Sequence, residues 1–280
     1  MFKQINLLSE IKQRVKPTIV YRWIIRLIRF GFVAKGSIYG TIGLVAVFAL
    51  LQRDQEILGT HGILVEIAEE PLGRLLIGIL MIGLMGYVLR RFIQAVFDPK
   101  HPGEFNLKRL IHRCGYLMSG LTYSGIVYTA SQLFIGLDAE DDDTIEDFTD
   151  QLFEHPFGLW LIIIAGIFTV GVGISYLYGS VSESYISELK PSLNERLKTW
   201  ATGLGKVGIA ARGISFIMIG VLLLEAAFLL RSDFAGGLAN ALKHLDNLPF
   251  GELGLGAIAF GFIAYAIYML VVALYGRNWI

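Results

Sequence analysis

The chain has 280 residues, of which 54% are hydrophobic and only 17% are charged, whereas an average globular protein carries about 25% charged residues. Its 24 basic and 24 acidic residues cancel. This balance argues against a nucleic-acid-binding protein, which needs a net basic surface. The mean hydropathy of +0.59 nearly excludes a soluble enzyme and predicts an integral membrane protein.

Residues 1–28 form a basic segment before the first long apolar run. Arg22, Arg26 and Arg29 fall on one helical stripe, with Trp23 beside it. This composition is typical of an amphipathic helix that lies in the plane of an anionic lipid surface. We therefore expect membrane lipids, with anionic headgroups at the cytoplasmic face, as partners. The sequence indicates no particular protein partner.

Six apolar runs follow, and each is close to the length of about 20 residues that crosses a bilayer as a helix. Because backbone groups in lipid must be paired within the segment, these runs predict six transmembrane helices and an all-α fold. Lys and Arg concentrate in the N-terminal segment, beside the second-to-third and fourth-to-fifth connections, and after the last run. Both termini are therefore expected in the cytoplasm. The runs are 31–51, 71–89, 114–137, 157–182, 207–230 and 253–276.

The odd-numbered runs open with similar strings, which are RFGFVAKGSIY from residue 29, RCGYLMSGLTY from residue 113 and KVGIAARGISF from residue 206. The even-numbered runs open with Pro-Leu-Gly at 71–73 and Pro-Phe-Gly at 156–158 and 249–251. We expect each proline in the first turn of its helix, where its missing N–H costs no hydrogen bond.

Matching offsets in two separate motifs define a threefold internal repeat. The units are unit 1 (29–98), unit 2 (113–182) and unit 3 (206–276). Each unit has two spans and returns the chain to the same side, so all three are inserted in the same direction. The sequence thus predicts three parallel two-helix repeats around a pseudo-threefold axis along the membrane normal.

On these motifs, over about residues 29–276, the chain resembles bacterial membrane proteins that carry three tandem copies of domain of unknown function 1206. The resemblance implies this architecture and a multi-pass protein of the bacterial inner membrane, and it implies no activity. Unit 2 departs most from the pattern. Ser119 stands where the other units have Lys35 and Arg212.

Small residues line one face of the first span, where Gly36, Gly40 and Gly43 are spaced four and three apart. Such a stripe lets two helix backbones approach closely in lipid. We interpret it as a helix contact inside the bundle. A narrow pore lined by exposed backbone is the alternative.

Lys35 and Arg212 lie within lipid-crossing segments, where an ionisable residue is a candidate for function. Each lies six residues, or about 9 Å, beyond the basic residue that opens its unit. Their long side chains are therefore able to extend back to lipid phosphates, a behaviour known as snorkelling. The alternative is that they face the axis and bind an anion or a lipid headgroup.

Glu225 is the acidic residue of the otherwise apolar segment 221–230, and Gln132 is its counterpart in unit 2. A buried carboxylate needs a partner or a proton. We expect a network of Arg74 with Glu225 or with Glu252 near the outer leaflet, either as a structural clamp or as a proton or cation site.

The outer loops contain short apolar patterns that predict amphipathic helices resting on the membrane before each even span. These patterns are Leu64 with Ile67, Phe148 with Leu152 and Phe153, and Leu242 with Leu245.

Motifs for catalysis are absent from the sequence, which has no helical pair of metal-ligating histidines, no nucleophilic serine turn and a single cysteine, Cys114. We expect no catalytic residue, metal site or cofactor, and we interpret the chain as a non-enzymatic scaffold or accessory protein of the membrane. The alternative is a small channel or transporter for ions or small solutes. Its path would pass the polar residues Glu225, Gln132, Lys35 and Arg212.

Overall fold

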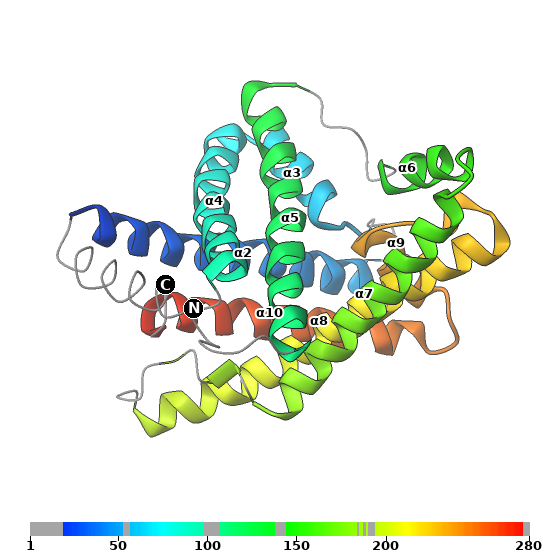
Figure 1. The fold of residues 1–280 in the computed structure, drawn as a ribbon. Helices are drawn as coiled ribbons and strands as arrows, with labels where there is room; N and C mark the ends of the chain where they lie inside the picture. The colour runs from blue at the N-terminus through cyan, green and yellow to red at the C-terminus, as the bar shows by residue number, and fades with distance from the viewer. Residues whose placement is uncertain are drawn as a thin grey trace.

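The computed structural model describes residues 19–52, 57–97, 107–137, 144–183, 185–186, 189 and 194–276. Within these ranges the chain forms nine α-helices and no strand, as the sequence predicts for an all-α fold (Figure 1). The helices are α2 (Ile19–Leu51), α3 (Thr60–Glu69), α4 (Gly73–Phe97), α5 (Leu107–Ile135), α6 (Thr144–Phe153), α7 (Gly158–Val181), α8 (Glu195–Leu229), α9 (Leu238–Asp246) and α10 (Gly251–Tyr275), with a 3₁₀ turn, η2 (Ser232–Phe234), before α9.

Five of the described helices, α2, α4, α7, α8 and α10, are long and apolar enough to cross a membrane. Each of the three units contributes a long odd helix, a short helix and a long even helix, in that order. The repeated order of elements follows the repeated sequence motifs, and it gives a multi-helix architecture of the kind found in membrane proteins.

The odd helices begin earlier than their apolar runs. Helix α2 begins at Ile19 and is continuous to Leu51, so the residues from Arg22 to Arg29 extend the first long helix instead of forming a separate one. The rest of the predicted interfacial segment, residues 1–18, lies outside the described residues.

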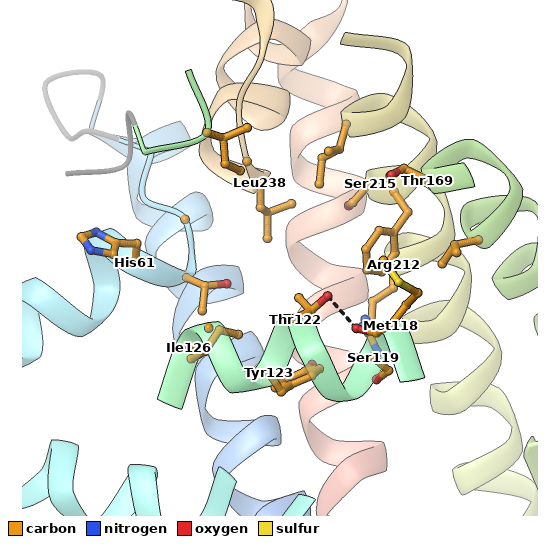
Figure 2. A pocket seen from close by; sticks show the side chains of 18 of the residues that line it. His61, Met118, Ser119, Thr122, Tyr123, Ile126, Thr169, Arg212, Ser215 and Leu238 are labelled. Carbon is orange, nitrogen blue, oxygen red and sulfur yellow. Dashed lines mark hydrogen bonds between the residues drawn. The ribbon is translucent and has the colours of Figure 1, made fainter. Parts of the chain in front are cut away.

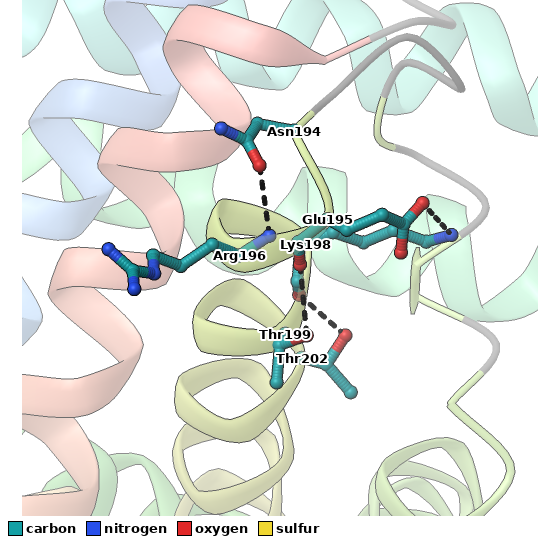
Figure 3. A network of polar contacts seen from close by, with 6 residues as sticks. All are labelled: Asn194, Glu195, Arg196, Lys198, Thr199 and Thr202. Carbon is teal, nitrogen blue, oxygen red and sulfur yellow. Dashed lines mark hydrogen bonds and ion pairs between the residues drawn. The ribbon is translucent and has the colours of Figure 1, made fainter.

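The start of α8 is fixed by polar contacts outside the apolar run (Figure 3). The Asn194 side chain accepts a hydrogen bond from the backbone N–H of Arg196 at 3.1 Å, which pairs one of the free donors of the first turn. The Thr199 hydroxyl donates to the carbonyl of Glu195 at 2.9 Å. Lys198 forms an exposed ion pair with Glu195 at 3.7 Å.

The connection between α7 and α8 is tied to the first turns of α8. The Tyr185 hydroxyl donates to the carbonyl of Thr202 at 2.7 Å, and Ser180 donates to the carbonyl of Lys206 at 2.8 Å. Burial, followed by the nearby Glu183 carboxylate, raises the pKa of Tyr185 to about 12. The phenol therefore stays protonated, and it keeps this hydrogen bond across the physiological pH range.

Each even helix is preceded by the same turn. The backbone N–H groups of Gly73, Gly158 and Gly251 donate to the carbonyl three residues earlier, at 2.7, 3.0 and 2.8 Å. The helices begin at these glycines, so each proline lies in the preceding turn, and the expectation that it lies in the first helical turn is wrong. A Cβ at Gly73 would collide with the carbonyl oxygen of Ile67, and equivalent collisions would occur in the other units. Glycine is therefore required wherever the short helix closes onto the even helix.

Short helices are present in all three outer loops, as the sequence indicates, but two of them pack differently from the expectation. Leu64 of α3 and Leu242 of α9 are fully buried against the long helices. Their apolar faces therefore cover the bundle and not a lipid surface. Phe148 of α6, in contrast, is 60% exposed, consistent with the expected outward-facing apolar side.

The long helices pack mainly as three pairs that join different units. These pairs are α4 with α5, α7 with α8, and α10 with α2, and Figure 1 shows each pair running side by side. Within units 1 and 3 the two long helices also pack on each other, α2 on α4 and α8 on α10. The long helices of unit 2, α5 and α7, are not among the extensively packed pairs of the described chain.

The small-residue stripe of α2 lies against α10. A Cβ added at Gly36 would meet the Ala266 carbonyl oxygen at 3.1 Å, and one at Gly43 would meet the Ala259 carbonyl oxygen at 2.7 Å. The stripe is therefore a helix contact, as predicted from the sequence. Helix α10, which packs against it, is the most buried of the five long apolar helices: 61% of its apolar segment is buried, against 22% for α7.

Candidate functional site

Two cations are buried among tyrosines in the centre of the bundle. Lys35 of α2 is 1% exposed and Arg212 of α8 is 2% exposed. Snorkelling is therefore wrong for both residues, because their charged ends point into the protein. The alternative, that they face the interior, is the arrangement observed.

Lys35 is held by aromatic rings from three units. Its Nζ donates a hydrogen bond to the Tyr87 hydroxyl at 2.8 Å and lies 4.4 Å from the centre of the Tyr87 ring. The ring centres of Tyr123 and Tyr265 lie 4.8 and 5.6 Å away. Cation–π contacts of this kind are worth about 2 kcal/mol or more when they are desolvated, so they offset part of the cost of burying the charge.

Arg212 of unit 3 also donates a hydrogen bond to a tyrosine of its own unit, as Lys35 does in unit 1. Its Nη1 donates to the Tyr265 hydroxyl at 2.6 Å, and its guanidinium lies 4.8 Å from the ring centres of Tyr39 and Tyr176 and 4.9 Å from that of Tyr265. With the 85- and 93-residue offsets of the even spans, Tyr87 and Tyr265 occupy equivalent positions. One cation–tyrosine pair therefore occurs in unit 1 and in unit 3.

Unit 2 contributes neither member of this pair. Ser119 replaces the cation and Val172 replaces the tyrosine. The Ser119 hydroxyl lies 3.4 Å from the Tyr87 hydroxyl. We call the group of buried cations and surrounding phenols the tyrosine–cation cluster, and its members are Lys35, Arg212, Tyr39, Tyr87, Tyr123, Tyr176 and Tyr265.

A cavity of about 590 Å³ lies beside this cluster, between α5 and α7. This volume falls within the range of about 300–1,000 Å³ that is typical of small-molecule sites. Arg212, Tyr123 and Ser119 contribute polar atoms to its wall, while His61 and Leu238 line the end that lies away from Arg212 (Figure 2).

Arg212 is the strongest polar feature of this cavity. Within the described ranges no ion pair joins it to a carboxylate, and its Nε is buried without a hydrogen-bond acceptor. Tyr123 is 4% exposed, and its buried hydroxyl also has no hydrogen-bond partner among the described residues. Both groups can donate a hydrogen bond, and neither has an acceptor in the part of the chain that the structure describes. An anionic oxygen would supply one.

The structure does not form the expected network at the other polar residues. The Arg74 guanidinium is close to Gly136 at the end of α5, and in the described part of the chain no ion pair joins it to Glu225 or Glu252. Arg74 belongs to α4, whose long-helix neighbours are α2 and α5, whereas Glu225 belongs to α8, which packs on α7 and α10. Glu225 is half-buried, and Glu252 is exposed in the first turn of α10.

Gln132 is satisfied locally, since its side-chain amide donates to the Tyr128 hydroxyl one turn earlier at 3.2 Å. Of the six predicted polar residues, Arg212 lines the cavity, and Glu225, Gln132, Arg74, Glu252 and Lys35 are not among its lining residues.

Sequence reasoning missed the tyrosines of the cluster. One signal was present in the sequence. Tyr87 and Tyr265 occur in the two units that also carry a cation at the position of Lys35, and Val172 occurs in the unit that does not. This paired presence and absence across the repeat points to a contact between the two positions.

Comparison with known proteins agrees with the threefold repeat. The family model described as Domain of Unknown Function (DUF1206) matches the chain three times in tandem, over residues 30–98, 114–182 and 207–276. The chain is also similar to a Bacillus subtilis (strain 168) protein named Uncharacterized protein YxxB, with 28% identity over 270 residues that cover 96% of this chain and 95% of the relative. No solved structure matches the chain.

Proposed function

Since the chain belongs to the DUF1206 family, we propose that it is a non-enzymatic, multi-pass membrane protein that binds a small anionic molecule beside Arg212 and serves as a carrier or channel component. The observation that supports this function most directly is Arg212 itself. It is a permanently charged, buried group that lines a cavity and has no carboxylate partner in the described residues.

The proposal includes six spans arranged as three like-oriented hairpins around an axis along the membrane normal. Helix α5, the third in chain order, is counted as a span beside the five long apolar helices, since its 29 residues exceed the length of about 20 that is needed to cross a bilayer. The three interunit helix pairs support the threefold arrangement, because each joins an even helix to the odd helix of another unit. The distribution of Lys and Arg supports cytoplasmic termini in a bacterial inner membrane.

Two charges in a bundle interior are costly unless neighbouring groups stabilise them. Phenol oxygens and ring faces compensate in part, and an anion at Arg212 would compensate further by a charge-assisted hydrogen bond. A protein with no role for this charge would be equally well packed with an apolar side chain, since replacing a buried ion by a hydrophobic group is often neutral or stabilising.

The test is anion-dependent stabilisation of the full chain in phosphatidylcholine nanodiscs. Because a ligand that binds the folded state raises its apparent stability, at least one anion among chloride, acetate, phosphate and oleate is expected to raise the melting temperature of the wild type. The same shift is expected in Arg196→Gln, a matched control because Arg196 is exposed at the start of the same helix. It is expected to be lost in Arg212→Gln. If no anion gives a shift that depends on Arg212, the proposed function is wrong.

A scaffold or accessory role is the second candidate, and the tightly packed contact between α2 and α10 favours it. Phe262 of α10 and Ile42 of α2 are fully buried. In that case Arg212 is structural, and liposomes that contain the protein would show no flux of the stabilising anion. Flux that is present in the wild type and lost in Arg212→Gln would instead support the carrier or channel.

A further inference from the structure

The cavity occupies the place where unit 2 would have its own helix contact. In units 1 and 3 the first glycine of the odd helix touches the even helix of the same unit. A Cβ at Gly31 would lie 2.6 Å from the Tyr87 nitrogen, and one at Gly208 would lie 2.5 Å from the Tyr265 Cα. The equivalent Gly115 has no atom within 4 Å of an added Cβ, and it lines the cavity.

The lining of the cavity suits a hydrocarbon chain with a polar group at one end. Most of its wall is apolar, and the polar donors Arg212 and Tyr123 belong to the cluster at its inner side. The Ser215 hydroxyl at the wall donates to its own helix, to the Ala211 carbonyl at 3.0 Å. Apolar lining is contributed by Leu64, Met118, Ile126, Phe168, Val172 and Ile219.

The cavity is also open on the outer surface of the bundle. Met118 and Phe168, on the two helices that border it, are 41% and 38% exposed, and Gly125 and Gly171 on the same two helices have no atom within 4 Å of an added Cβ. In a membrane-spanning bundle this surface faces acyl chains, so the opening between α5 and α7 leads to lipid.

We infer that the cavity takes an anionic amphiphile from the bilayer, with its acyl chain between α5 and α7 and its carboxylate or phosphate oxygens on Arg212 and Tyr123. The inference rests on the proposed function and specifies its ligand. Neither the anionic headgroup nor the acyl chain alone matches the whole cavity. A free inorganic anion leaves the apolar wall unfilled, and a neutral chain leaves two buried donors without an acceptor.

The experiment measures the melting temperature of the full chain in phosphatidylcholine nanodiscs that contain increasing mole fractions of a probe. The probes are oleate and phosphatidate for the complete ligand, acetate and inorganic phosphate for the headgroup alone, and methyl oleate for the chain alone. Oleate or phosphatidate is expected to raise the melting temperature, while the headgroup and chain probes have no effect at matched concentration. A response to oleate without phosphatidate, or the reverse, identifies the headgroup.

Two variants separate binding from folding. Arg212→Gln is expected to weaken the oleate or phosphatidate response about ten- to hundredfold, which corresponds to the loss of one hydrogen bond to a charged group. Val172→Trp leaves Arg212 in place and fills the cavity from α7, so it is expected to abolish the response in a protein that still folds. Arg196→Gln is the matched control and keeps the full response.

The outcomes also separate this inference from the proposed function. If acetate or phosphate stabilises the protein as strongly as oleate, and does so through Arg212, the anion site stands and the amphiphile is wrong. If methyl oleate is as effective as oleate, the cavity is a neutral lipid groove and the inference is again wrong. If neither these probes nor chloride acts through Arg212, both proposals are wrong.

Discussion

Unit 3 and unit 2 have the same order of helices and differ in how their two long helices meet. In unit 3, Gly208 lets α8 approach α10 closely, and Arg212 donates to Tyr265 across the same contact. In unit 2, Ser119 and Val172 stand at the cation and tyrosine positions, and a cavity separates α5 from α7.

The units of this repeat are therefore stabilised in two ways. A closed unit has a contact of its own between its long helices. The open unit depends on its neighbours, because α5 packs on α4 of unit 1 and α7 packs on α8 of unit 3. Loss of both the cation and the tyrosine removes the hydrogen bond within the unit, and the side chains that replace them are too small to fill the space.

Enlarging the glycine at the closed contact of unit 3 is expected to destabilise the fold most. Gly208→Leu places side-chain atoms where the Tyr265 backbone lies, and overpacking of this size is expected to cost about 3 kcal/mol or more of folding free energy. The matched variant Gly115→Leu projects into the cavity and is expected to retain the fold. Chemical denaturation of both variants in detergent measures the difference. Equal losses would mean that unit 2 is as closed as unit 3.

A smaller loss is expected when the hydrogen bond of the closed unit is removed. Tyr265→Phe deletes the acceptor of the Arg212 bond, and a buried hydrogen bond to a charged group is worth about 1.5–3 kcal/mol. Tyr128→Phe is the control, because Tyr128 is 64% exposed on α5 and its hydroxyl accepts a bond from Gln132. A Tyr265→Phe protein as stable as its control would contradict a role for this bond in closing unit 3.

The smallest effect is expected at the cation position of the open unit. Ser119→Ala removes a hydroxyl that makes only a 3.4 Å contact with Tyr87, so the free energy of unfolding is expected to fall by no more than about 0.5 kcal/mol. The same denaturation series checks this value. A loss above about 1.5 kcal/mol would show that Ser119 does in unit 2 what the cations do in the other units.

The repeat, its units and the contact role of the α2 glycines were predictable from the sequence, because close backbone approaches demand glycine at fixed positions. Gly36 against α10 and Gly73 in the turn before α4 belong to the motifs that revealed the repeat, and Gly43 belongs to the stripe of small residues. The family model matches the chain over the three units that these motifs define.

The sequence did not predict that the side chains of Lys35 and Arg212 point into the bundle. Helices such as α8 are apolar on nearly every side, so the sequence marks no polar face for Arg212. Its acceptor Tyr265 lies 53 residues later. The expected pairing of Arg74 with Glu225 failed for a related reason, since similar depth in a bilayer does not place two residues on adjoining helices.

The most direct test of the open unit is photolabelling with a fatty acid that carries a diazirine in its chain, in nanodiscs containing the full protein. Ile164 of α7 is 61% exposed and is not among the residues that line the cavity, so it serves as the positive control for labelling from lipid. Ile219 of α8 is half-buried and lines the cavity, so peptide mass spectrometry is expected to find adducts there and none at Leu84, which is fully buried in the closed unit 1. Adducts at Ile164 with none at Ile219, or equal labelling of Leu84, would contradict a lipid-accessible cavity specific to unit 2.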